Sequence, residues 1–422
     1  MLSFLQIIIL VFGFLRLLTD EILRSRNISH ITSLSKSLPD QVKGVMNDQE
    51  WTECSSYTLE KSRMSRVEDM CSFILLSSVL VFALPWYFSE WTQGASVSPW
   101  VCSLFASAFL LLIQVPDLFF DWFRQFGVEQ KYGFNQSTKQ LWITDKIKGC
   151  LIGFPFLFVL IGFLDWLFRL LSSIFPSFWW ILAFCAFFSV QLLIFILWPK
   201  LILPLFNKLT PLDDGELKDR LMKLATQTGF HAKSIEVIDG SKRSTHSNAY
   251  FTGFGKFRRI VLFDTLVEQM SIDELEAIVA HEIGHYRLGH IPKRLIISFL
   301  VGLGGFAFID YLSKSEWFYD GLSLPTESMG SLAPLIVIIS LYSGGFTFWI
   351  SPISNIFSRK HEYEADKFAA ISTGKSTFLS SALRKLYKKN KNFPLPDKWL
   401  SFFHHSHPSL MEREHALKDL KL

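Results

Sequence analysis

Long apolar runs alternate with polar segments along the chain, and this alternation predicts its architecture. Seven runs approach or exceed the roughly 20 residues that a helix needs to cross a bilayer. We therefore predict transmembrane helices at residues 2–18, 71–91, 98–120, 151–173, 178–198, 294–312 and 334–353. The first run is as short as a signal peptide, but no small-residue cleavage site follows it, which favours a membrane anchor. The pattern predicts a mainly α-helical, polytopic membrane protein.

Composition narrows the class of protein further. Of the 422 residues, 50% are hydrophobic and 19% are charged, whereas soluble domains carry about 25% charged residues. The net charge of +4 is too small to indicate binding to nucleic acid. These values exclude a disordered chain or a coiled coil and argue against a wholly soluble protein.

The basic residues separate onto one side of the predicted membrane. The connections at 92–97, 174–177 and 313–333 contain a single Lys or Arg, which is Lys314. Nearly all the other basic residues lie in the segments 19–70, 121–150, 199–293 and 354–422. Because cytosolic segments carry an excess of Lys and Arg, we predict a lumenal N-terminus and a cytosolic C-terminus.

The polar segment 199–293 has the periodicity of a small domain with both helices and strands. Its periodicity predicts an amphipathic helix, a short strand and the two strands of a β-hairpin, at residues 212–228, 235–239, 248–254 and 258–264. Ser271 and Glu274 have the spacing of a capping box. We expect them to begin a helix that continues beyond His285.

That helix carries the sequence His281-Glu282-Ile283-Gly284-His285. Residues four apart lie about 40° apart around a helix, so both imidazoles can bind one metal ion. The glutamate between them can then act as general base toward a metal-bound water. With the His and Glu content of this chain, the pattern would arise by chance about 0.01 times. It therefore predicts a catalytic metal site rather than a surface helix with two histidines.

A catalytic zinc site usually has three protein ligands, and this motif supplies two. His290 would lie about 180° from His281 around a continuous helix, so we expect it to point away from the metal. Glu362 and Asp366 lie four residues apart on another predicted helix. One of them can bind zinc while the other orients a ligand imidazole, and the sequence leaves open which does which.

Residues 404–413 form a further group of possible functional residues, with His407 and Arg413 among them. Acyl transfer at zinc needs a donor to the developing oxyanion, and a His or Arg from another segment meets this need. His-rich turns are also common at protein surfaces, so the spacing alone assigns no role to this group.

Together these motifs resemble those of the CAAX prenyl protease 1 family, which are integral-membrane zinc endopeptidases. The resemblance covers most of the chain and is loosest at the N-terminus and over residues 19–70. It rests on Glu129 and on the stretches 134–136, 240–251, 259–264, 280–290, 358–366 and 406–413. It implies one Zn²⁺ per chain with His281, His285 and Glu362 as ligands, Glu282 as base and Asp366 as support for a ligand imidazole.

The resemblance also implies roles for residues outside the metal site. His407 and Arg413 would stabilise the oxyanion or tie the site together. Asn248, Ala249 and Tyr250 would bind the substrate backbone by strand addition. The substrates would be prenylated CAAX proteins or peptides, from which the last three residues are removed by attack of a zinc-activated water.

The family implies a fold in which seven transmembrane helices enclose a chamber, with a cytosolic zincin-like metalloprotease domain that contains a small β-hairpin or sheet. We accordingly expect membrane lipid around the protein, in the endoplasmic reticulum. We expect four segments. Residues 1–198 would hold five transmembrane helices, with cytosolic connections at 19–70 and 121–150, and residues 199–293 would form a cytosolic catalytic segment with the His-Glu-Ile-Gly-His helix. Residues 294–353 would hold two more transmembrane helices, and residues 354–422 would form a cytosolic catalytic segment with the third zinc ligand.

Two other functions share some of these features. A site-2-type intramembrane metalloprotease carries its motif inside a transmembrane helix, but here Asp273, Glu274, Glu276 and Arg287 flank the motif. A membrane transporter or scaffold with a vestigial zinc site would have no need of Glu282, because metal binding alone does not require a base. Both alternatives are therefore less favoured than the peptidase.

Overall fold

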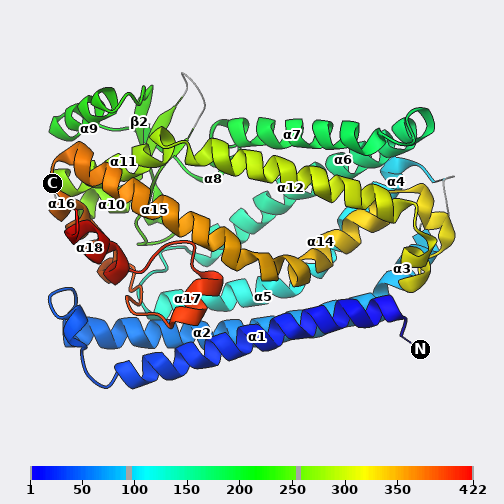
Figure 1. Ribbon diagram of the computed structural model, residues 1–422, viewed down its shortest axis with the longest axis horizontal. Helices are drawn as coiled ribbons and strands as arrows, with labels where there is room; N and C mark the ends of the chain where they lie inside the picture. The colour runs from blue at the N-terminus through cyan, green and yellow to red at the C-terminus, as the bar shows by residue number, and fades with distance from the viewer. Residues whose placement is uncertain (1, 92–96, 253–257, 421–422) are drawn as a thin grey trace.

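Long helices fill most of the molecule, and a small sheet lies at one end of them (Figure 1). The computed structural model describes residues 2–91, 97–252 and 258–420. The sheet lies at the end of the long axis where the C-terminus lies, whereas the N-terminus lies toward the other end. The mainly α-helical architecture with a small sheet agrees with the prediction.

A first group of helices overlaps or lies next to the predicted apolar runs. They are α1 (Phe4–Leu34), α2 (Asp48–Ser78), α3 (Leu84–Trp91), α4 (Pro99–Ile113), α5 (Val115–Phe123), α6 (Lys139–Ile174), α7 (Trp179–Leu201), α8 (Leu203–Phe206), α12 (His290–Ser313) and α14 (Ala333–Thr347). Six helical stretches of the described chain are long and apolar enough to cross a membrane, and they cover the last six predicted spans to within one or two residues at their ends.

The first predicted span lies within α1. This helix carries Arg16, Asp20 and Glu21 beside its apolar half, and it is not one of the six stretches. The protein is therefore a membrane protein with several spanning helices, and the count of seven stays a prediction.

The connections at 19–70 and 121–150 are mostly helical. α1 continues to Leu34, and α2 begins at a capping box formed by Asn47 and Glu50. The polar residues of α1 and α2 pair with each other, as in the 2.6 Å contact between Arg24 and Asp69. The polar composition of 19–70 therefore reflects a helical hairpin with ion pairs between its two arms.

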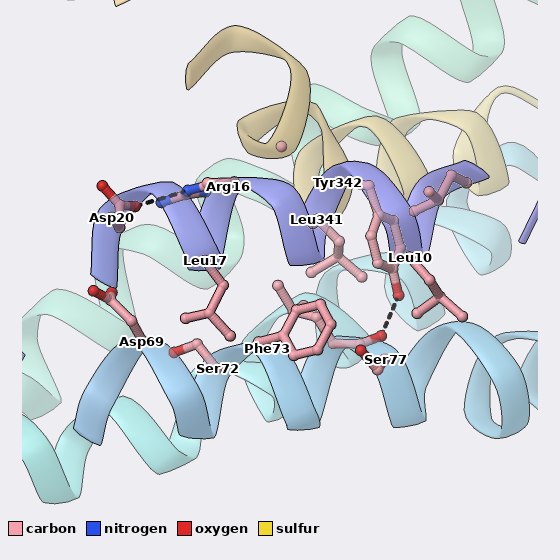
Figure 2. Close-up of a pocket in the computed structure, with 14 residues that line it drawn as sticks. Leu10, Arg16, Leu17, Asp20, Asp69, Ser72, Phe73, Ser77, Leu341 and Tyr342 are labelled. Carbon is pink, nitrogen blue, oxygen red and sulfur yellow. Dashed lines mark hydrogen bonds and ion pairs between the residues drawn. The ribbon is translucent and has the colours of Figure 1, made fainter. Parts of the chain in front are cut away.

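Figure 2 shows a pocket where α1, α2 and α14 meet. Apolar side chains, including Leu10 and Phe73, line one part of it, and Arg16 lies 3.7 Å from Asp20 at the other end. The residues predicted to form the metal site are not among those that line this pocket. It is a gap between membrane helices, separate from the candidate site.

The sheet has four strands in the order β1-β2-β4-β3. They are β1 (Leu209–Pro211), β2 (Ser234–Ile238), β3 (Ala249–Thr252) and β4 (Arg259–Phe263). β3 and β4 are antiparallel, as predicted for a hairpin, and the residues 253–257 between them lie outside the described part. In the described chain β3 pairs only with β4, so its other edge carries backbone groups without a strand partner.

Helices from both polar segments share one core with this sheet. The remaining helices are α9 (Glu216–Gln227), α10 (Asp264–Gln269), α11 (Ile272–Arg287), α13 (Glu316–Gly321), α15 (Ser351–Thr373), α16 (Ser376–Lys389), α17 (Lys398–His404) and α18 (Leu410–Lys418). Buried Leu224, Leu262 and Ile278 from the first segment share a cluster with Leu383 and Leu410 from the second. Two segments separated by membrane helices therefore build one domain.

Candidate metal centre

The helix that carries the two motif histidines, α11, is fixed at its N-terminal end. The side chain of Ser271 accepts a hydrogen bond from the backbone of Glu274, and the side chain of Glu274 accepts one from the backbone of Ser271, as predicted. Glu274 also accepts hydrogen bonds of 2.7 Å from Ser381 and Lys385 on α16. The helix ends at Arg287, so it is shorter than the continuous helix expected from the sequence.

α15 lies directly against α11 beside the motif. A Cβ atom on Gly284 would lie 3.2 Å from the Cα of Ala365 and 3.1 Å from the Phe368 ring. Any side chain at this position would push the two helices apart. Gly284 therefore permits the close approach that brings Glu362 to the histidines.

His281, His285 and Glu362 form a single cluster. The Nε2 atoms of the histidines lie 3.2 Å apart, and each lies 3.4 Å from a carboxylate oxygen of Glu362. One ligand atom from each of the three residues falls within 4.8 Å of the others. His281 and Glu362 are buried, so the cluster lies inside the domain.

The donor set fits a metal ion. Oε2 of Glu362 is buried and makes no hydrogen bond within the described part of the chain. A buried carboxylate oxygen without a partner is costly unless a cation satisfies it. Two imidazoles and one carboxylate are also the donor types that catalytic zinc sites use.

Asp366 and Arg413 stand behind this cluster. Oδ1 of Asp366 lies 2.9 Å from Nδ1 of His281, and Arg413 donates to both oxygens of Asp366, with 2.8 Å from its Nε. Nη1 of Arg413 lies 3.7 Å from Glu362. The sequence left open which of the two carboxylates is the ligand, and the geometry distinguishes them. Glu362 faces both histidines, whereas Asp366 faces the far side of the His281 ring.

The electrostatics of the cluster favour positive charge at its centre. Burial alone would lower the pKa of His281, but the carboxylates of Asp366 and Glu362 raise it to about 9. Burial would raise the pKa of Glu362, but the two histidines hold it well below its usual value. Burial would likewise raise the pKa of Asp366, and Arg413 keeps it low. A divalent cation would supply positive charge there in place of the proton on His281.

Glu282 and His407 lie beside this cluster. Burial raises the pKa of Glu282, which suits a carboxylate that must accept a proton near neutral pH. His407 is exposed, and its Nε2 lies 3.4 Å from Glu362 while its Nδ1 lies 2.9 Å from the Ser406 hydroxyl. The structure thus brings His407 to the open side of the cluster, whereas Arg413 is buried on its inner side.

The residues expected to bind the substrate lie at the edge of the sheet. Ala249 and Tyr250 belong to β3, and Asn248 directly precedes it. The backbone oxygen of Asn248 accepts a hydrogen bond from Phe263, which joins it to β4. β3 also packs against α11, so its free edge runs beside the helix that holds the histidines.

His290 lies outside the three-donor cluster, as expected, but the continuous helix on which that expectation rested was wrong. Gly289 has φ of +68°, which breaks the helix after Arg287 and starts α12 in a new direction. The Nδ1 atom of His290 consequently lies 2.9 Å from Nδ1 of His285. Glycine is the usual residue just after a helix end, and this signal in the sequence contradicts a continuous helix.

His290 belongs to a second group of polar residues that sequence reasoning missed. Its Nε2 lies 3.0 Å from Glu364, and its ring stacks on His361 with centroids 4.0 Å apart. His290, His361 and Glu364 therefore form a cluster next to the first one. Glu364 and His361 lie near Glu362 on α15, where only Glu362 and Asp366 were predicted to be functional.

A cluster of two histidines and a glutamate, with a further glutamate in the motif and several membrane-spanning helices, defines a membrane-bound metallopeptidase. Two family models match the chain. Residues 27–208 match the model described as CAAX prenyl protease N-terminal, five membrane helices, and residues 211–421 match peptidase family M48.

Relatives agree with these models. CAAX prenyl protease 1 of Saccharomyces cerevisiae is 40% identical over 71% of this chain and 68% of its own length. The CAAX prenyl protease 1 homolog of Homo sapiens is 30% identical over 98% of this chain and 95% of its own. The crystal structure of S. mikatae Ste24p has a TM-score of 0.86 at 31% identity and covers 98% of both chains. The chain therefore belongs to the CAAX prenyl protease 1 group of peptidase family M48, whose members are metal-dependent proteases.

We expect His281→Ala and Glu362→Ala each to lower the amount of bound metal, because each variant removes one of three converging donors. Metal analysis of the purified variants measures this loss. The matched control is His231→Ala, since His231 is exposed and lies outside the cluster. Full metal content in either ligand variant would show that the cluster is not the metal site.

Proposed function

We propose that this protein is a zinc endopeptidase that removes the last three residues from prenylated CAAX proteins. The observation that carries the proposal is the cluster of His281, His285 and Glu362, in which a buried oxygen of Glu362 makes no hydrogen bond within the described part of the chain. One Zn²⁺ per chain would be bound there, and it would act as a Lewis acid and lower the pKa of water. The known names of the relatives supply the substrate class.

The protein's own groups would carry the remaining steps. Glu282 would accept a proton from the attacking water and return it to the leaving amine. The free edge of β3, at Asn248, Ala249 and Tyr250, would hold the substrate as an added strand beside α11. Such an arrangement aligns the scissile bond with the motif helix and reduces the entropy cost of reaction.

His407 and Arg413 would serve different purposes. His407 lies on the open side and would donate to the developing oxyanion. Arg413 already donates twice to Asp366, which in turn contacts His281. We therefore assign Arg413 the task of holding Asp366 and the ligand in place.

The proposed location is the endoplasmic reticulum membrane, with the catalytic segments in the cytosol. The distribution of basic residues supports this orientation, and CAAX proteins are made in the cytosol. The helix α11 is not one of the stretches that can cross a membrane, which disfavours the site-2-type alternative. The retained Glu282 disfavours a transporter or scaffold.

The direct test is incubation of the purified protein with a farnesylated CAAX peptide, with and without a chelator. We expect Glu282→Gln to keep its zinc and to lose about 10²–10⁴-fold in rate, because the amide leaves the ligands intact but cannot accept a proton. Peptide cleavage and zinc content are measured on the same sample. Glu268→Gln, an exposed position on α10, is the control. Wild-type turnover in zinc-loaded Glu282→Gln would refute the role of the base.

The substrate lipid is expected to act mainly on KM. A farnesyl chain that leaves water gains about 0.8 kcal/mol per buried CH₂, and the proposed chamber between the spans would bury it. The metal site itself contacts only the peptide, so a CAAX peptide without lipid should still be cut, with a higher KM and a similar kcat. Equal KM values for the two peptides, measured below the micelle concentration, would show that the protein does not bury the chain.

The proposed topology can be tested independently of catalysis. A glycosylation acceptor placed in residues 313–333 should be modified, because that connection is predicted to be lumenal. An acceptor in residues 121–150 should remain unmodified. Modification in 121–150 alone would reverse the orientation and place the catalytic segments in the lumen.

A further inference from the structure

The second ring nitrogen of His285 contacts another histidine. Its Nε2 faces the cluster with His281 and Glu362, while its Nδ1 lies 2.9 Å from Nδ1 of His290. Nε2 of His290 lies 3.0 Å from a carboxylate oxygen of Glu364. A row of hydrogen-bonded groups therefore leads from a proposed metal ligand through His290 to an acid.

The fold restrains the positions of His290 and Glu364. The left-handed turn at Gly289 brings His290 back toward the site, where it is only 1% exposed. The ring of His361 lies 4.0 Å from the His290 ring at an interplanar angle of 12° and fixes its plane. Glu364 lies on α15, the same helix that carries Glu362. One helix thus positions both the proposed ligand and the acid at the end of the row.

The positions of the protons follow from the contacts. If Nε2 of His285 binds the metal, its proton must lie on Nδ1. Nδ1 of His285 then donates to Nδ1 of His290, which must be unprotonated to accept. The proton of His290 therefore lies on Nε2, where it is donated to Glu364. Each ring has one tautomer that satisfies all three contacts.

We propose that His290 and Glu364 are positioning residues that hold the ring and the tautomer of His285 for metal binding. Asp366 faces Nδ1 of His281 in the same manner, so each proposed histidine ligand has its own partner. Partners of this kind orient ligand imidazoles and raise their basicity. The inference rests on the proposed metal site and adds the residues that prepare one of its ligands.

A second metal site is the alternative role for His290, His361 and Glu364, since their ligand atoms lie within 4.8 Å of one another. Two features argue against it. When His285 binds the metal, the contacts above require the proton of His290 to lie on Nε2, so this nitrogen has no lone pair for a second metal. The two rings are also nearly parallel, so their in-plane lone pairs do not converge on one point.

The test compares zinc affinity, by chelator competition, in the full-length protein and its variants. We expect His290→Leu and Glu364→Ala to weaken zinc binding by about 10–100-fold. His290→Gln should recover part of the loss, because its amide can accept from His285 and donate to Glu364. Glu364 is partly exposed, so we expect Glu364→Ala to fold. This variant therefore still tests the proposal if His290→Leu, at a buried position, does not fold.

A spectroscopic readout and a control complete the experiment. The visible absorption of the Co²⁺-substituted protein should change in His290→Leu and return toward wild type in His290→Gln. His361→Phe keeps the ring stack but removes the nitrogen atoms, so it should bind zinc as the wild type does.

Three results would overturn the proposal. Wild-type zinc affinity in both His290→Leu and Glu364→Ala would refute the pair while leaving the proposed metal site intact. Two zinc ions per chain, one of them lost in His361→Phe, would replace the pair with a second metal site. A wild-type protein that binds no zinc would refute the proposed function, and the pair with it.

Discussion

The close packing of α11 on α15 is the constraint on which the candidate site depends. Gly284 has no side chain, so the backbone of Ala365 can approach the helix that carries both histidines. This approach brings Glu362 on α15 within 3.4 Å of both histidines. The same contact places Asp366 behind His281 and Glu364 near His290. One interface between two helices therefore sets the position of the three α15 acids around the site.

Buried charge is the second element of this arrangement. Glu362, Asp366 and Arg413 are all buried, and removing charged groups from water is costly. Each of them contacts at least one group of opposite charge within the cluster, where a protonated histidine counts as positive. Such networks are weak contributors to stability, but they hold polar groups in a defined geometry. The cost is consistent with a site whose role is chemical rather than structural.

The sequence predicted those features that depend on local spacing. The pair His281 and His285 follows from helical periodicity, and the capping box at Ser271 follows from a pattern of four residues. The strands of the hairpin and the apolar spans are similarly local. The choice between Glu362 and Asp366 required the relative placement of two helices, which spacing alone cannot give. The resemblance named Glu362, and the geometry agrees with it.

The sequence reasoning failed where a single residue changed the direction of the chain. His290 was placed by extending a regular helix through Gly289, whose left-handed conformation ends that helix. The pattern also gave no sign of the ion pairs in 19–70, which join the side chains of two consecutive helices. Both features arise from contacts or turns that periodicity does not encode.

The shared core of the two polar segments has a consequence for biogenesis. The histidines are synthesised before the helices α12 and α14, and Glu362 and Arg413 follow them. The third donor can therefore reach the first two only after both intervening helices have been inserted and have turned the chain back. Until then the histidine helix lacks part of its hydrophobic core, and it depends on late, long-range contacts of the kind that slow folding. Correct membrane insertion thus becomes a precondition for metal capture, and a misinserted chain is left without a complete site.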